Sequence, residues 1–171
     1  MVYTRWERNK DVATLVDAAG TTLATVPQPL PEQATVTTTD GSWEVTYSNT
    51  ELRSEAADAT VSMVASAEKP WRNAKEVELR IGTQDYKAIN EARNDWVYVA
   101  GDTKVGQFSG SGNGVRAAIT EFEEDASLDT DARIFFSLVT RTILEARLRR
   151  TQLAWTSTMV IMTIAIILTL I

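Results

Sequence analysis

The C-terminal segment constrains the fold more than any other part of this 171-residue chain. Residues 151–171 carry no ionisable side chain. As a helix they would extend about 31 Å, close to the roughly 30 Å hydrocarbon core of a bilayer. A helix that is apolar on every face is buried either in lipid or in protein. The segment is therefore either a transmembrane anchor or a helix in the core of a globular domain.

Flanking residues favour the anchor. Arg147, Arg149 and Arg150 precede the run and no charged side chain follows it, which is the asymmetry of a span whose N-terminal side is cytoplasmic. Trp155 lies one turn into the run, at the depth of an interfacial aromatic belt. We therefore predict a single-pass, tail-anchored protein of the plasma membrane, with a cytoplasmic N-terminus and its C-terminus on the outer side.

Two threonines in the predicted span are candidates for helix–helix contact. Thr156 and Thr163 lie seven residues apart, which places them on one face of a helix. Small hydroxyl side chains let transmembrane helices approach closely and form hydrogen bonds. The predicted partners are helices of other integral membrane proteins within the lipid bilayer, although a single span also tolerates threonine without such a contact.

The residues before this segment have the pattern of β-hairpins. Residues 12–26 are two β-prone runs around the turn at 17–20, and residues 35–47 surround the turn sequence Asp40-Gly41. Residues 48–60 look like a loop or short helical turn, and residues 83–94 fit either a strand or a short helix. Further short strands are expected at residues 76–81, 96–100, 104–108 and 115–122. The predicted fold class is a β-rich α+β domain of antiparallel hairpins, forming a sandwich or partly closed barrel.

The chain changes character after Gly114, since neither glycine nor proline follows. Ser127, Asp129 and Asp131 are suitable helix caps. The helix that follows has an apolar stripe of Phe135, Phe136, Val139, Ile143 and Ala146, and a polar stripe of Ser137, Arg141 and Glu145. We predict an amphipathic helix docked on the β-rich domain. The chain then divides into residues 1–126, 127–150 and 151–171, with one long helix continuing from the second part into the span.

The composition argues against most chemistry. The chain contains no histidine and no cysteine, which removes the usual general base, thiol chemistry and the commonest metal ligands. Its net charge of −6 disfavours nucleic-acid binding. The glycines at 110, 112 and 114 do not match a nucleotide-binding loop, and the carboxylates of residues 121–131 lack calcium-loop spacing. We predict no catalytic residue, metal ligand or cofactor; a carboxylate-based hydrolase is the weakest hypothesis.

Three residues outside the predicted span are candidate partner contacts. Trp6 lies between two arginines, and Trp71 and Arg72 stand side by side. Tryptophan and arginine are enriched at protein interfaces. The alternative is that both tryptophans belong to the core and the neighbouring arginines extend past them to water.

The overall layout resembles the small accessory subunit of the actinobacterial cytochrome bcc–cytochrome c oxidase supercomplex. The resemblance rests on chain size, the β-rich part and the tail from Arg147 to Ile171, and it includes no diagnostic motif. It implies a structural subunit that stabilises the association of respiratory complexes and carries no redox centre.

The repeated hairpins, such as Leu15–Val26, also resemble the tubby and scramblase-like family. In that family a hydrophobic C-terminal helix threads a closed barrel. This resemblance implies a lipid-binding or regulatory protein that works alone at the membrane. A barrel cavity and a basic surface patch would favour this alternative, whereas an acidic surface without a cavity would count against it.

Overall fold

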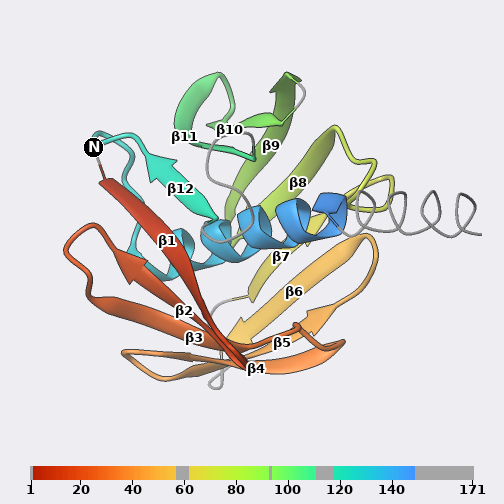
Figure 1. The fold of residues 1–171 in the computed structure, drawn as a ribbon. Coiled ribbons are helices and arrows are strands. Elements are labelled where there is room, and N and C mark those ends of the chain that lie inside the picture. Colours follow the sequence, from red (N-terminus) through yellow and green to blue (C-terminus); the bar gives the residue numbers. More distant parts are fainter. Residues whose placement is uncertain (1, 57–61, 93, 111–117, 149–171) are drawn as a thin grey trace, which may run out of the picture.

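The computed structural model describes residues 2–56, 62–92, 94–110 and 118–148. These residues form a closed antiparallel barrel of twelve strands around one helix (Figure 1). The strands are β1 (Val2–Asn9), β2 (Val12–Asp17), β3 (Thr22–Pro27), β4 (Gln33–Thr38), β5 (Ser42–Tyr47), β6 (Glu51–Ala56), β7 (Ser62–Ser66), β8 (Glu76–Ile81), β9 (Gln84–Ala92), β10 (Asp95–Ala100), β11 (Thr103–Ser109) and β12 (Ile119–Phe122). Each strand pairs with its neighbours in sequence, and β1 pairs with β12 to close the barrel.

Alternation of side chains along the strands determines which residues face the interior. In β4 and β5, Val36 and Val45 are buried while Thr35 and Glu44 are exposed. In β8, Val77 and Leu79 are buried between exposed Glu76, Glu78 and Arg80. Successive strand residues point to opposite faces, so these patterns give the barrel one apolar face that is turned inward.

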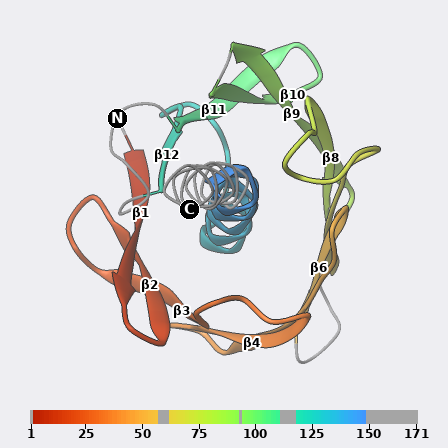
Figure 2. The same ribbon diagram turned by 45° about the vertical axis from the view of Figure 1, so that its right-hand side comes forward.

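The central helix, residues 130–148, runs through the barrel (Figure 2). Its N-terminus is capped by Asp129, whose Oδ1 accepts a hydrogen bond from the backbone N–H of Ala132 at 2.7 Å. Residues 134–143 are all buried. Phe136 lies at the middle of this run, with its ring 4.6 Å from the Tyr98 ring and 5.2 Å from the Tyr86 ring, centroid to centroid. The helix therefore supplies the centre of the hydrophobic core.

The fold corrects the predicted sandwich or partly closed barrel with a helix docked on it. Three of the strands that complete the closed barrel are β1, β6 and β9. The sequence patterns instead predict a loop or short helical turn at residues 48–60, and they leave residues 83–94 open between a strand and a short helix. The helix lies inside the barrel and is not docked on its surface. Its predicted polar stripe is buried there, since Ser137 and Arg141 are only 0% and 3% exposed. A polar stripe indicates a solvent-facing surface only when no polar partner is available inside the protein.

The predicted transmembrane span is also corrected. Within the described residues, no helix is both long enough and apolar enough to cross a membrane. The central helix carries Arg133, Arg141 and Glu145 along its length. On this finding, the predictions of a tail-anchored protein and of a single-pass localisation are not upheld. Residues 151–171, on which those predictions depended, lie outside the described residues.

Gly106 allows β11 and β12 to meet. A Cβ atom at this position would lie 2.6 Å from the backbone oxygen of Glu121 and 3.3 Å from the Phe122 side chain. Because the first contact is with backbone, the strands would have to separate.

We expect Gly106→Ala to lower the free energy of unfolding by about 1.5 kcal/mol, measured by urea denaturation. Thr37→Ala, at an exposed strand position, is the control and should change it by less than about 0.5 kcal/mol. An unchanged midpoint for Gly106→Ala would contradict this close approach.

Candidate functional site

The buried polar groups between the helix and β10 and β12 are partnered with one another. The hydroxyl of Tyr98 lies 3.0 Å from the backbone oxygen of Phe136 and 2.9 Å from Oγ1 of Thr140. Thr120 Oγ1 donates to Thr140 Oγ1 at 2.9 Å. Burial strongly raises the pKa of Tyr98, so the phenol stays protonated at neutral pH. A neutral, fully enclosed network of this kind orients the helix and offers no reactive group to a substrate.

A second set of contacts holds the helix against β1. Trp6 Nε1 donates to the backbone oxygen of Ser137 at 2.8 Å, and the hydroxyls of Ser137 and Thr4 lie 2.6 Å apart. The guanidinium of Arg141 lies over the Trp6 ring, 5.1 Å from its centroid. Arg141 Nε donates to Glu145 Oε1 at 2.8 Å, and the same oxygen accepts from Arg8 Nη2 at 3.0 Å. These side chains fix the rotation of the helix inside the barrel.

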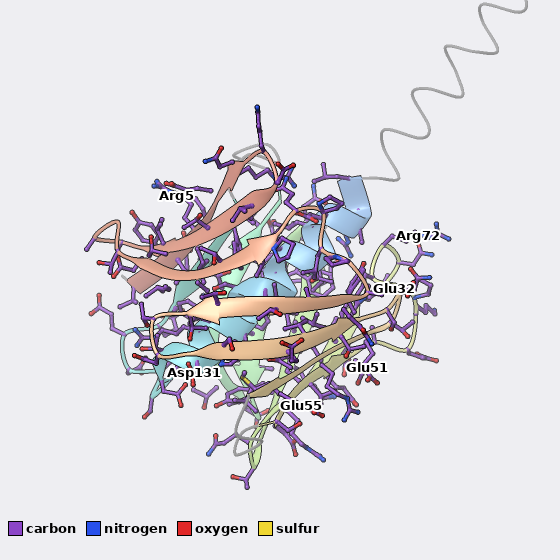
Figure 3. All side chains as sticks on the ribbon, turned by 90° about the horizontal axis from the view of Figure 1, so that it is seen from below. Arg5, Glu32, Glu51, Glu55, Arg72 and Asp131 are labelled. Atoms are coloured by element: carbon purple, nitrogen blue, oxygen red, sulfur yellow. The ribbon has the colours of Figure 1, made fainter. Side chains whose placement is uncertain are left out.

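The two candidate tryptophans lie in the core. Trp6 is 2% exposed and Trp71 is 1% exposed. Trp71 Nε1 donates to the backbone oxygen of Ser48 at 2.7 Å, which anchors the loop between β7 and β8 over the end of the barrel. Arg72 is exposed on that loop and is directed away from the barrel (Figure 3). Of the three predicted partner contacts, Arg72 alone lies at the surface.

The residues of the predicted membrane boundary fall into two groups. Arg147 lies at the end of the central helix, where its guanidinium is 4.8 Å from the Trp96 ring centroid and donates to the backbone oxygen of Ala74 at 2.8 Å. Burial lowers its pKa. Arg147 therefore fastens the helix to the barrel end. The other predicted residues lie outside the described part of the chain: Arg149, Arg150, Trp155, Thr156 and Thr163.

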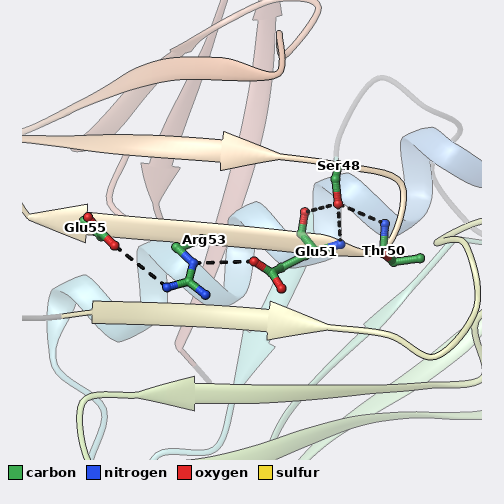
Figure 4. Close-up of polar contacts among 5 residues, drawn as sticks. All are labelled: Ser48, Thr50, Glu51, Arg53 and Glu55. Atoms are coloured by element: carbon green, nitrogen blue, oxygen red, sulfur yellow. Dashed lines mark hydrogen bonds and ion pairs between the residues drawn. The ribbon is translucent and has the colours of Figure 1, made fainter.

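On the outer wall formed by β6 to β9, the cations are paired with carboxylates. Arg53 lies between Glu51 and Glu55, at 3.4 Å and 3.9 Å (Figure 4). Arg80 pairs with Asp85 at 2.7 Å, which raises the pKa of the arginine and lowers that of the carboxyl group. Lys87 pairs with Glu76 at 2.6 Å. Such exposed pairs add little stability, but each of these three cations has a carboxylate partner.

The outer wall over β10 to β12 differs in composition. A shallow groove of about 210 Å³ crosses these strands. Its lining includes Val97, Ile119, Phe108 and Trp96, together with the carboxylates of Glu91, Asp95 and Glu121. Among the described residues, no lysine or arginine lines this groove or forms an ion pair with these three carboxylates. The groove therefore combines an aliphatic floor, Val97 and Ile119, with a rim of carboxylates that form no ion pair within the described residues, and Lys104 Nζ donates to Gln107 of its lining at 2.6 Å.

Sequence reasoning did not identify this groove. One signal was present in residues 96–100, where Val97 and Val99 alternate with Trp96 and Tyr98. Both faces of that strand are apolar, although the outer face of an antiparallel sheet is usually polar when only water covers it. Glu91, Asp95 and Glu121 come from three different strands. Their common location depends on the register of the barrel, which the sequence alone did not supply.

Three carboxylates lie close together at the N-terminal end of the central helix. Asp131 is labelled in Figure 3. Its partial burial raises its pKa, and the negative charges of Asp129 and Asp40 raise it further. Since a raised pKa in the folded state favours the protonated form, ionisation of Asp131 costs stability as the pH rises from its unfolded-state pKa through its folded-state pKa. The described residues contain no group of carboxylates arranged to hold a metal ion. The ionised form of Asp131 is therefore a local electrostatic cost.

We expect Asp131→Asn to raise the thermal unfolding midpoint at pH 7 by about 1–2 °C. The gain should disappear near pH 3, where the wild-type carboxyl group is protonated in both states. Differential scanning calorimetry across this range measures the effect. Asp125→Asn, at an exposed neighbouring position, is the control and should shift the midpoint less. A lower midpoint for Asp131→Asn would mean that attraction between its charge and the helix N-terminus outweighs the repulsion.

Comparison with known proteins does not assign a family. No protein family matches the chain, and no curated protein matches it. A solved structure of a protein from Arabidopsis thaliana is similar at 14% identity, over 84% of this chain and 89% of that chain, with a TM-score of 0.48. A likeness at that level supports no functional argument, so function has to be proposed from the molecule itself.

Proposed function

We propose that this chain is a non-catalytic accessory protein that binds partner proteins through the outer wall of its barrel. The observation that supports this proposal is the filling of the barrel by the chain's own helix, in which residues 134–143 are buried. Barrels that hold small ligands keep part of their interior open for them. Here the interior is used for the core, so the outer wall is the surface available for recognition.

The alternative, a lipid-binding protein, has less support. Binding to anionic membrane surfaces depends on clusters of lysine and arginine, whereas this chain has a net charge of −6. Cations on the β6 to β9 wall, such as Arg53 and Lys87, are already paired with carboxylates. The association of respiratory complexes, implied by the resemblance to a supercomplex subunit, stays a prediction about the identity of the partners.

Isolation from the native cell under gentle conditions tests the proposal. The tagged full-length chain is purified at low ionic strength, and native mass spectrometry determines the mass of the assembly. We expect a complex of defined stoichiometry that is larger than the 18.9 kDa chain. Part of it should dissociate in high salt, because salt screens the charges of an acidic surface. Recovery of the chain alone and monomeric would overturn the proposal.

A further inference from the structure

We propose that the groove over β10, β11 and β12 is the partner-binding site, and that it takes an extended segment in which apolar side chains are flanked by lysine or arginine. This inference rests on the proposed function and specifies the surface and the chemistry of the partner. It is supported by three independent features of the groove: its apolar floor, its unpaired rim charges and the short ladder between two of its strands.

The floor of the groove is apolar on the outer side of the barrel. Val97 faces outward because it alternates with buried Trp96 and Tyr98. It lies opposite Ile89 of β9 in the register, and Ile89 is 36% exposed. Ile119 adds a further aliphatic side chain from β12. Removing these aliphatic side chains from water would contribute favourably to binding.

The rim of the groove selects for a cationic partner. Asp95 accepts a hydrogen bond from Ser109 Oγ, and Glu121 accepts one from Gln107 Nε2, each at 2.6 Å. These neutral donors orient the carboxylates, and a neighbouring cation, Lys104, donates to Gln107 Oε1 at 2.6 Å and pairs with Glu123 at 3.0 Å. On β6 to β9, by contrast, Arg53, Arg80 and Lys87 each pair with at least one carboxylate. Charge complementarity contributes specificity and association rate, so lysine or arginine flanking the apolar side chains fits this rim.

The strand arrangement favours an extended segment. Among the described residues, β11 and β12 share two residue pairs, Gly106 with Phe122 and Gln107 with Glu121. The backbone N–H of Glu123 donates to the Val105 oxygen, and the Ala118 oxygen accepts from the N–H of Trp6. Backbone groups of successive strand residues point alternately to the two neighbouring strands. Those of Ile119 therefore point toward β11, at a position beyond the last pair of the ladder, Gln107 with Glu121. Main-chain groups beside a groove can bond an added strand.

Nuclear magnetic resonance of the ¹⁵N-labelled full chain tests the inference with a defined probe, the blocked pentapeptide Arg-Leu-Arg-Ile-Arg. We expect saturable shift changes at the amides of Val97, Gln107 and Ile119. Two control peptides separate the contributions: Glu-Leu-Glu-Ile-Glu should not bind, and Arg-Gly-Arg-Gly-Arg should bind at least about tenfold more weakly, because it lacks the apolar anchors. No saturable change, equal binding of the glycine peptide, or changes mapping to β6 to β8 would overturn the inference.

Matched variants make the test specific to the groove. Val97→Arg fills the floor and adds a like charge toward the peptide, so the dissociation constant should rise more than about twentyfold. Val12→Arg changes an aliphatic side chain of β2 that is 43% exposed and lies outside the groove, and it should leave the dissociation constant unchanged. The double variant Glu91→Gln/Glu121→Gln keeps the shape of the rim and should raise the dissociation constant about fivefold. If Val97→Arg fails to give a folded spectrum, this conservative double variant still tests the groove. An unchanged dissociation constant for the double variant would contradict the role of the rim.

The same variants distinguish this inference from the proposed function. If the wild-type chain purifies in a defined assembly and the groove variants remain in it, the groove is not the contact but the accessory role stands. If the wild-type chain is monomeric in its native cell, the proposed function fails whatever the peptide does. If the groove variants leave the assembly while Val12→Arg stays, both proposals are supported.

Discussion

Replacing Phe136 by alanine is expected to lower the free energy of unfolding by about 4 kcal/mol. The side chain is 0% exposed at the middle of the central helix. Its ring makes edge-on contacts with Tyr86, Tyr98 and Phe122, at centroid distances of 5.2, 4.6 and 6.2 Å. Removing it leaves a cavity that rigid strands on three sides can fill only partly, and it also removes aromatic contacts worth about 0.5–1.5 kcal/mol each.

Urea denaturation, followed by tryptophan fluorescence, measures this effect. The transition midpoint should fall while the slope stays the same, because the surface exposed on unfolding is nearly unchanged. Val12→Ala is the control: the side chain is 43% exposed and the change should stay within about 0.5 kcal/mol. A loss below about 1 kcal/mol for Phe136→Ala would mean that the helix does not form the core of the barrel in solution.

Residues along this helix also show how far the sequence predicts the fold. The apolar stripe of Phe135, Phe136, Val139 and Ile143 was predicted, and all four side chains are 0% exposed. The predicted hairpins at residues 12–26 and 35–47 are present as β2–β3 and β4–β5. These elements depend on local patterns, namely helical periodicity and strands around turn residues.

The closed barrel could not be predicted from the same local patterns. In β6, Leu52 and Ser54 face the interior while Glu51, Arg53 and Glu55 face outward. A short strand with one large apolar residue has almost no periodic signal and resembles a loop. It becomes a strand because β5 and β7 bond to it on both sides, which is a tertiary effect.

The location of the helix was also beyond local reasoning. Ser137 and Arg141 give it a polar stripe, but Thr4 and Trp6 of β1 provide partners for that stripe inside the barrel. Those partners are more than 130 positions away in sequence. Similarly, the candidate groove collects carboxylates from β9, β10 and β12. Both features depend on which strands become neighbours, and the composition of a single segment does not contain that information.

Arg141 itself provides the second large expected effect, in the opposite direction. Its side chain is 4% exposed, and the Nη1 and Nη2 atoms are buried without a hydrogen-bond partner among the described residues. A buried guanidinium that loses water at both terminal nitrogens carries a desolvation cost that one carboxylate contact does not fully offset. The Trp6 ring below it contributes a cation–π attraction, which is worth about 1–2 kcal/mol.

We therefore expect Arg141→Met to raise the free energy of unfolding by about 2 kcal/mol. Methionine keeps most of the stem volume and can pack its sulfur against Trp6. Glu145 stays paired, because its Oε1 also accepts from Arg8 at 3.0 Å, so the substitution does not leave a buried charge alone.

The comparison is made in parallel urea titrations with Arg53→Met as the control. Arg53 pairs with Glu51 and Glu55, but its side chain is 47% exposed, so its replacement should change stability by less than about 1 kcal/mol. If Arg141→Met destabilises the protein by more than about 1 kcal/mol, the terminal nitrogens have partners in solution. Arginine would then be required at this position to hold the helix to β1, since the apolar packing against Trp6 is the same in both proteins.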